Sequence, residues 1–168
     1  MAYELGYRTQ PVDNLHLSLA TFYNQYRDLR SVDTNSAAAA PPAFYFANHL
    51  EATTYGFEVS AKLFVTHWWR IRAGYSYLHE DFTILSPKTF PQTTAFEAID
   101  PADQFLLQSM MDIASHFQLD GTVRYVGEVP AAIALPSVPS YITFDLRIGY
   151  VYKWLTFTLV GSNLAEKY

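Results

Sequence analysis

Residues 51–82 read EATTYGFEVSAKLFVTHWWRIRAGYSYLHEDF, and this stretch decides the fold. Its first half alternates apolar with polar or small side chains, and the alternation resumes in the second half after a break at residues 66–68. A period of two places successive side chains on opposite faces, which is the pattern of a β-strand. We therefore predict two long strands that are joined by a tight turn into an antiparallel hairpin.

The length of these strands points to a membrane. Each keeps its alternation for about ten residues, whereas strands usually have about five or six, and a tilted strand needs about 9–11 residues to cross a bilayer. The polar face carries Glu58, Lys62, Arg70 and Arg72 beside glycine and serine, as expected of the wet inside of a barrel. A soluble sheet with one face in its core alternates in the same way, so alternation alone leaves both interpretations open.

Composition favours a single β-rich domain. The chain has 168 residues, of which half are hydrophobic, and it contains 13 tyrosines and 12 phenylalanines, which favour strands and membrane interfaces. A net charge of −5 argues against nucleic acid as a partner, because phosphate binding calls for clustered lysine and arginine. The absence of cysteine excludes disulfides and thiolate metal sites. No apolar run approaches the 18 or so residues of a membrane-spanning helix.

Similar alternation recurs along the chain, and we predict about eight strands, at residues 3–8, 15–29, 51–65, 69–82, 105–113, 117–125, 142–150 and 155–162, with residues 44–46 leading into the third. A helix is the competing interpretation for residues 105–113. Short turns near Pro11, Thr66, Ala114 and Tyr152 alternate with long connections at residues 31–42, 83–103 and 128–139, which we predict to be irregular loops. Short turns at one end and long loops at the other are typical of outer-membrane barrels.

Aromatic side chains are predicted to form a belt at each end of the apolar face, as membrane barrels require. The short-turn belt would contain Trp69, Phe117, Tyr150 and Trp154, and the long-loop belt Tyr23, Tyr77, Tyr125 and Tyr141.

Several stretches resemble the C-terminal barrel of TonB-dependent outer-membrane receptors: YGFEVSAKL, IRAGYSYL, DPADQFLLQS, FQLDGTVRYVGEVP, PSYITFDLRIGY and NLAEKY. The resemblance implies an all-β, antiparallel, up-and-down transmembrane barrel of 22 strands with a plug domain inside it. It also implies import of siderophores, cobalamin, sugars or other scarce nutrients, with energy supplied through the TonB complex. We find no signal peptide, TonB box, plug or closing strand, so we expect residues 1–168 to be part of the barrel domain.

Eight charged residues are predicted to line the lumen of the barrel: Glu58, Lys62, Arg70, Arg72, Asp120, Arg124, Asp145 and Arg147. We expect them mainly to form cross-strand pairs on a solvated wall rather than to contact a substrate. In the family that the chain resembles, ligands are held by outer loops and the plug, so the three long connections are the better place for a small-molecule substrate.

No cofactor, metal or catalytic residues are predicted. The histidines at positions 16, 49, 67, 79 and 116 do not have metal-ligand spacing, and the G-x-S-x-G nucleophile elbow is absent. We therefore expect a non-enzymatic part of an outer-membrane transporter in contact with lipid, a plug, the TonB complex and a scarce nutrient such as a siderophore. The alternatives are a soluble lipocalin-like barrel that binds a small hydrophobic ligand and, less favoured, a barrel enzyme.

Overall fold

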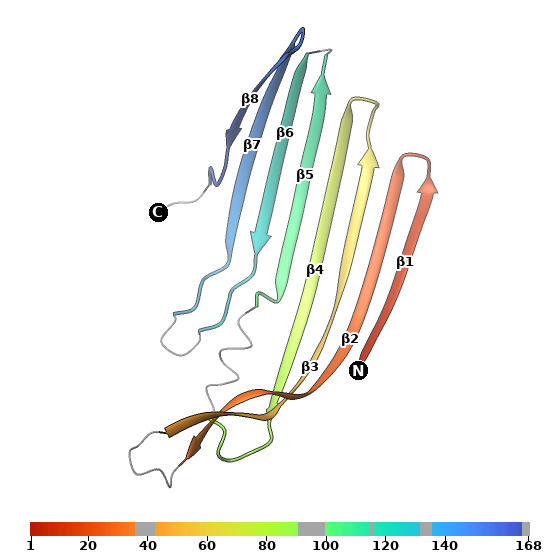
Figure 1. The fold of residues 1–168 in the computed structure, drawn as a ribbon. Helices are drawn as coiled ribbons and strands as arrows, with labels where there is room; N and C mark the ends of the chain where they lie inside the picture. The colour runs from red at the N-terminus through yellow and green to blue at the C-terminus, as the bar shows by residue number, and fades with distance from the viewer. Residues whose placement is uncertain (36–42, 91–99, 115, 132–135, 166–168) are drawn as a thin grey trace.

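The protein is one antiparallel sheet of eight strands in the computed structural model, which describes residues 1–35, 43–90, 100–114, 116–131 and 136–165 (Figure 1). Strands pair only with their neighbours in sequence, so the topology is up-and-down. The strands are β1 (Ala2–Val12), β2 (Leu15–Asn35), β3 (Ala43–Phe64), β4 (Trp69–Ile84), β5 (Asp103–Ile113), β6 (Phe117–Val126), β7 (Tyr141–Tyr152) and β8 (Leu155–Gly161). The predicted fold is confirmed, and residues 105–113 form a strand rather than a helix.

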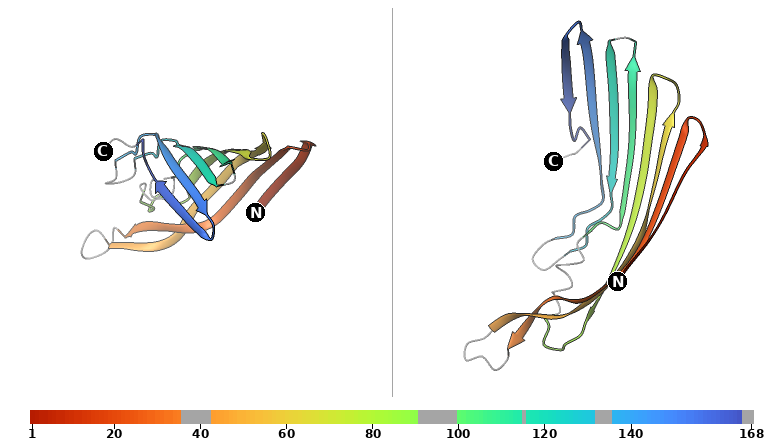
Figure 2. Two further views of the ribbon diagram at one scale, coloured as in Figure 1. Left: turned by 90° about the horizontal axis from the view of Figure 1, so that it is seen from above. Right: turned by 45° about the vertical axis from the view of Figure 1, so that its right-hand side comes forward.

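The register keeps two kinds of side chain on opposite faces of the sheet. Glu58 on β3 lies opposite Ser76 on β4, and Asp120 on β6 lies opposite Arg147 on β7. Residues that lie directly opposite each other point to the same side of an antiparallel pair. We call the side that carries these charged residues the polar face and the other side the apolar face. The sheet is strongly curved and twisted (Figure 2).

The described residues contain almost no hydrophobic core. Only Leu50 and Ala52 are buried among their hydrophobic side chains, whereas Leu5 and Leu159 on the apolar face are 74% and 71% exposed. The accessible surface is 11810 Å², against about 8,400 Å² expected for a globular monomer of this mass. An apolar face of this extent needs a cover, because soluble monomers rarely expose large contiguous apolar patches.

The apolar face has the height of a membrane. On β4 it presents aromatic and aliphatic side chains over residues 69–77 and then changes to His79 and Asp81. This run matches the roughly 9–11 residues with which a tilted strand crosses a bilayer. No helix within the described ranges is long and apolar enough to span a membrane.

Short and long connections alternate as predicted. The short ones, at residues 13–14, 65–68 and 153–154 and between Ala114 and His116, join strand ends that lie together at one end of the sheet (Figure 1). Two of them contain non-glycine residues in the left-handed region, Ala114 with φ of 54° and Lys153 with φ of 55°. We call this the short-turn end, and the opposite end the long-loop end.

Three details of the sequence-based prediction are wrong. The predicted loop at 31–42 begins too early, because β2 continues to Asn35 and pairs there with the start of β3; residues 36–42 lie outside the described residues. The loop predicted from residue 83 begins after Ile84. Tyr141 does not belong to the apolar belt, because it lies opposite Val126, in register with the polar face.

The part of β2 after residue 29 and the first part of β3, which pairs with it, extend past the rest of the sheet and bend away from it (Figures 1 and 2). The prediction missed this part of β2 because its alternation is inverted. Ser31 and Asp33 are fully buried, so polar side chains occupy the positions that an amphipathic strand usually gives to apolar ones.

Candidate functional site

All eight charged residues singled out from the sequence lie on the polar face. The register aligns them in rows across the strands: Lys62 is opposite Arg72, and Asp120 is opposite Arg147. One row continues from Arg70 through Met110 to Asp120. The structure therefore brings these residues onto one surface, although it pairs only some of them.

A chain of polar contacts crosses four strands near the short-turn end. Arg70 Nη2 on β4 donates to Asp112 Oδ2 on β5 over 3.1 Å, and Gln118 Nε2 on β6 donates to the other oxygen of Asp112 over 3.3 Å. Arg147 on β7 then donates to Gln118 Oε1 over 3.0 Å and to Asp120 Oδ2 over 2.8 Å. The contacts give each carboxylate a cationic or amide partner. We call these five side chains the polar chain.

A separate ion pair joins Arg124 on β6 to Asp145 on β7. The second oxygen of Asp145 accepts a hydrogen bond of 3.1 Å from the backbone N–H of Asn163, just after β8. Asp145 thus connects β6, β7 and the segment after β8. The expected cross-strand pairing is present for Arg70, Arg124, Arg147 and both aspartates.

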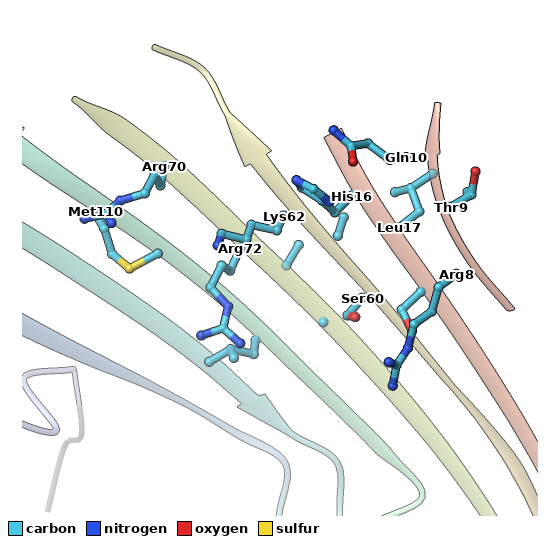
Figure 3. Close-up of a pocket in the computed structure, with 15 residues that line it drawn as sticks. Arg8, Thr9, Gln10, His16, Leu17, Ser60, Lys62, Arg70, Arg72 and Met110 are labelled. Carbon is cyan, nitrogen blue, oxygen red and sulfur yellow. The ribbon is translucent and has the colours of Figure 1, made fainter. Parts of the chain in front are cut away.

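The other three predicted residues, Glu58, Lys62 and Arg72, do not form ion pairs with described residues. Lys62 instead places its Nζ atom 4.6 Å from the centre of the Phe64 ring. Lys62 and Arg72 lie in a hollow of about 780 Å³ on the polar face (Figure 3). The hollow also receives Arg8 of β1 and His16 of β2.

The sequence-based set omitted four polar-face residues that the structure places among the others: Arg8, His16, Asp112 and Gln118. The signal was available for each, because all four stand at polar positions of alternating strands. What the sequence did not provide was the register between strands, which decides the neighbour of each side chain.

A second polar cluster lies at the long-loop end, outside the membrane-height band. The carboxylate of Asp33 accepts hydrogen bonds from Ser31 Oγ (3.0 Å) and Thr89 Oγ1 (2.8 Å), and His49 Nδ1 lies 2.7 Å from its other oxygen. Ser31 Oγ also accepts from the backbone N–H of His49 over 3.1 Å. We call these four residues the Asp33 cluster. It ties residues 85–90 to the extended ends of β2 and β3.

The environment of Asp33 favours its ionised form. Burial raises the pKa of this carboxyl group, but the hydrogen bonds from His49, Thr89 and Ser31, together with the charge of His49, outweigh burial and hold the pKa below its usual value. A carboxylate with three partners is a structural anchor, since its oxygens are occupied and Ser31 and Asp33 are fully buried.

Metal binding by the described residues has little support. They contain no group of three or more histidine, aspartate or glutamate side chains that could hold a metal ion. The hydroxyl of Ser31 contacts Asp33 and the backbone of His49 rather than the imidazole ring, so the Asp33 cluster lacks the contact between nucleophile and base that hydrolases require. The feature that distinguishes the polar face is its charged side chains, which the register aligns in rows across the strands.

Comparison with solved structures identifies sheets of the same fold. The siderophore receptor PiuA from Acinetobacter baumannii matches 99% of this chain with a TM-score of 0.75 and 24% identity. The FrpB iron transporter from Neisseria meningitidis also matches 99% of the chain, with a TM-score of 0.79 and 14% identity. The ferric yersiniabactin uptake receptor FyuA from Yersinia pestis matches 99% of the chain with a TM-score of 0.72 and 18% identity.

The chain spans about a quarter of these proteins, covering 24% of PiuA, 27% of FrpB and 24% of FyuA. A search of curated proteins finds no match. The fold that these structures share with the chain does not favour the soluble lipocalin-type alternative. The hollows of the described sheet also argue against a lipocalin-type barrel. Their charged linings come from the polar face, whereas a lipocalin would turn its apolar face inward around the ligand.

The model of one protein family, described as TonB dependent receptor-like, beta-barrel, matches residues 1–164. Nearly the whole chain is covered, including every strand of the sheet. The chain belongs to the TonB-dependent receptor β-barrel family of the outer membrane.

Proposed function

We propose that residues 1–168 form part of the barrel wall of an outer-membrane transporter that imports a scarce nutrient, such as a siderophore complex. The observation that carries this proposal is the two-sided sheet. Its apolar face has the height of a bilayer, and its opposite face holds charged residues in rows. A soluble sheet has no physical reason to leave apolar side chains such as Leu5 and Leu159 mostly exposed.

The proposed arrangement assigns a role to each face and end. The apolar face contacts lipid, and the polar face lines the barrel lumen, where the eight charged residues predicted from the sequence would lie. The short-turn end faces the periplasm and the long-loop end faces the outside, following the asymmetry of such barrels. Further strands, a plug domain and the contact with the TonB complex would come from parts of the receptor outside residues 1–168.

The choice of an iron complex rests on what the related structures carry. PiuA is a siderophore receptor, FrpB an iron transporter and FyuA a ferric yersiniabactin receptor. Identities of 14–24% support the fold and leave the substrate of this chain a proposal. We propose transport rather than catalysis, because the described residues contain no group of three or more metal-binding side chains, and the hydroxyl of Ser31 bonds to Asp33 and to the backbone of His49 rather than to its imidazole.

The test is growth and uptake with the complete receptor. A strain without the receptor gene is compared with the same strain that carries it, under iron limitation, with single siderophores as the iron source and radioactive iron as the tracer. We expect receptor-dependent and TonB-dependent uptake for one siderophore class, and the receptor in the outer-membrane fraction. Equal uptake by both strains for every siderophore and for other nutrients, or a receptor in the soluble fraction, would refute the proposal.

A further inference from the structure

At the long-loop end, β2 and β3 form a ribbon that the neighbouring strands do not reach. β1 pairs with β2 only as far as Asn24, and β4 pairs with β3 only as far as Leu50. Beyond these points the two strands pair only with each other among the eight strands of the sheet. We call residues 31–35 of β2 and 43–49 of β3 the arm. A two-stranded ribbon is marginally stable in water, so the arm needs further support.

Residues 85–90, which follow β4, supply a third segment to the arm. The backbone N–H of Thr34 donates to the carbonyl oxygen of Lys88 over 2.8 Å. The backbone N–H of Phe90 donates to the carbonyl oxygen of Val32 over the same distance. These bonds occupy the edge of β2 that faces away from β3, whereas β4 lies on the other side of β3. The chain after β4 therefore crosses the arm, and we call residues 85–90 the strap.

One buried carboxylate connects the strap to both strands of the arm. Asp33 on β2 is fully buried and accepts a hydrogen bond of 2.8 Å from Thr89 Oγ1 of the strap. His49 Nδ1 on β3 lies 2.7 Å from the other carboxylate oxygen, and the carbonyl oxygen of His49 accepts from the backbone N–H of Leu85 over 2.9 Å. A buried carboxylate that loses a donor is costly. We therefore expect the three segments to separate together rather than one at a time.

The arm is joined to the rest of the sheet through an irregular ladder. The pairing of β2 with β3 shifts register twice between Tyr26 and Ser31. Asp28, at the first shift, has a left-handed backbone with φ of 56°. Bulges disrupt the ladder and bend the strand, whereas the neighbouring β3–β4 ladder keeps one register throughout. We call residues 26–30 the hinge, and the arm bends away from the sheet beyond it (Figure 2).

We propose that the Asp33 cluster is a latch that makes the arm and the strap one conformational unit, which pivots against the rest of the sheet at the hinge. The latch ties three segments together, whereas the hinge interrupts a ladder, so motion concentrates at the hinge. The β2–β3 and β4–β5 connections are thereby coupled, and a molecule that displaces the strap displaces the arm as well. The inference does not depend on the proposed function, because it concerns only how segments of this chain move.

The first test is hydrogen exchange of the complete receptor in lipid vesicles, followed by mass spectrometry. Thr89→Val removes the hydroxyl that donates to Asp33 and changes the shape of the side chain little. We expect exchange to accelerate about tenfold at the amides of both the strap and the arm, because a buried carboxylate has lost a donor.

Thr83→Val is the matched control for this experiment. Thr83 is exposed on β4 and lies outside the Asp33 cluster, so its substitution should leave both exchange rates unchanged. Acceleration in the strap alone, or in neither segment, for Thr89→Val overturns the proposal.

The second test measures distances between pairs of spin labels in the complete receptor. Cysteine for labelling replaces Asn48 on the arm, Lys88 on the strap and, as a reference on β4, Asp81; all three are exposed. Asp28→Gly loosens the hinge, because glycine adopts a left-handed backbone readily and has more conformational freedom.

With Asp28→Gly we expect the arm–reference and strap–reference distance distributions to widen together, while the arm–strap distribution keeps its width. Adding Thr89→Val should then widen the arm–strap distribution as well. The proposal is overturned if the strap–reference distribution stays narrow while the arm–reference distribution widens. It is also overturned if Asp28→Gly alone widens the arm–strap distribution, or if it widens no distribution at all.

Discussion

Gly56→Ala should destabilise the receptor strongly, because β3 lacks room for a methyl group at this position. Gly56 lies on the polar face between Phe22 of β2 and Leu78 of β4. A Cβ atom built at Gly56 would collide with the backbone carbonyl oxygen of Tyr77 and would lie 2.8 Å and 3.1 Å from Cζ and Cε1 of Phe22. The ring of Phe22 can turn away, but the carbonyl belongs to the β3–β4 ladder and moves only with its strand.

The magnitude follows from three contributions. Overpacking in a tight site costs about 1–3 kcal/mol, and a weakened ladder hydrogen bond adds about 1 kcal/mol. The loss of glycine's freedom in the unfolded chain returns about 0.4–1 kcal/mol to the stability of the variant. We therefore expect a net loss of about 1–3.6 kcal/mol for Gly56→Ala.

Gly74→Ala is the matched control. Gly74 lies on the same face and in the neighbouring strand, and its added Cβ would meet only a backbone oxygen of Val59 at an ordinary 3.9 Å. Urea unfolding of both receptor variants in lipid vesicles, followed by tryptophan fluorescence, measures the difference. If Gly56→Ala and Gly74→Ala unfold at the same urea concentration, the tight packing at Gly56 is refuted.

Three further predictions test the two faces and the long-loop end. Leu107→Arg on the apolar face should cost about 2–4 kcal/mol in vesicles, whereas Gln108→Arg, one residue along, should cost far less; equal costs would contradict the assignment of the faces. A double-mutant cycle of Asp120→Ala and Arg147→Ala should give a coupling of about 0.2–1 kcal/mol, and zero coupling would contradict a functional ion pair. Because the pKa of Asp33 is lowered by folding, its contribution is complete above the unfolded value of about 3.9 and is lost as pH falls through the lower folded value. A spin label at Lys88→Cys should therefore keep its mobility from pH 8 to pH 5 and become mobile only under strongly acidic conditions; release near pH 6 would contradict this.

The sequence predicts the sheet well because alternation is a local signal. In residues 51–82 the alternation within each strand shows which side chains lie on the apolar face, and the turn between the strands is short enough to fix an antiparallel pair. The prediction fails where burial is polar. Ser31 and Asp33 are fully buried, and Asp33 accepts a hydrogen bond from Thr89, which comes from a segment far along the chain. The spacing of residues within β2 contains no signal of that contact.

The sequence predicted that the charged residues form cross-strand pairs, but it did not predict which residues pair with each other. Cross-strand pairing was expected, yet which arginine meets which aspartate depends on the register between the strands. A shift of one residue would move every side chain of a strand to the other face. The diagonal pair of Arg124 with Asp145 and the contact of Asp145 with Asn163 show how a single carboxylate serves three segments. The facing pair of Lys62 and Arg72 contradicts the expected pairing and appears only when the strands are aligned.

The two faces differ in how strongly they constrain the sequence, and this difference bears on the two cations that face each other on β3 and β4. A charge in the lipid-facing band costs about 2–4 kcal/mol near the middle of the bilayer, so the apolar face has few alternatives. A water-filled lumen tolerates most polar side chains, and folding alone therefore does not require two cations to face each other. Glutamine at position 62 or a carboxylate at position 72 would have avoided the repulsion. The polar face therefore accommodates the facing cations Lys62 and Arg72, which the apolar face could not.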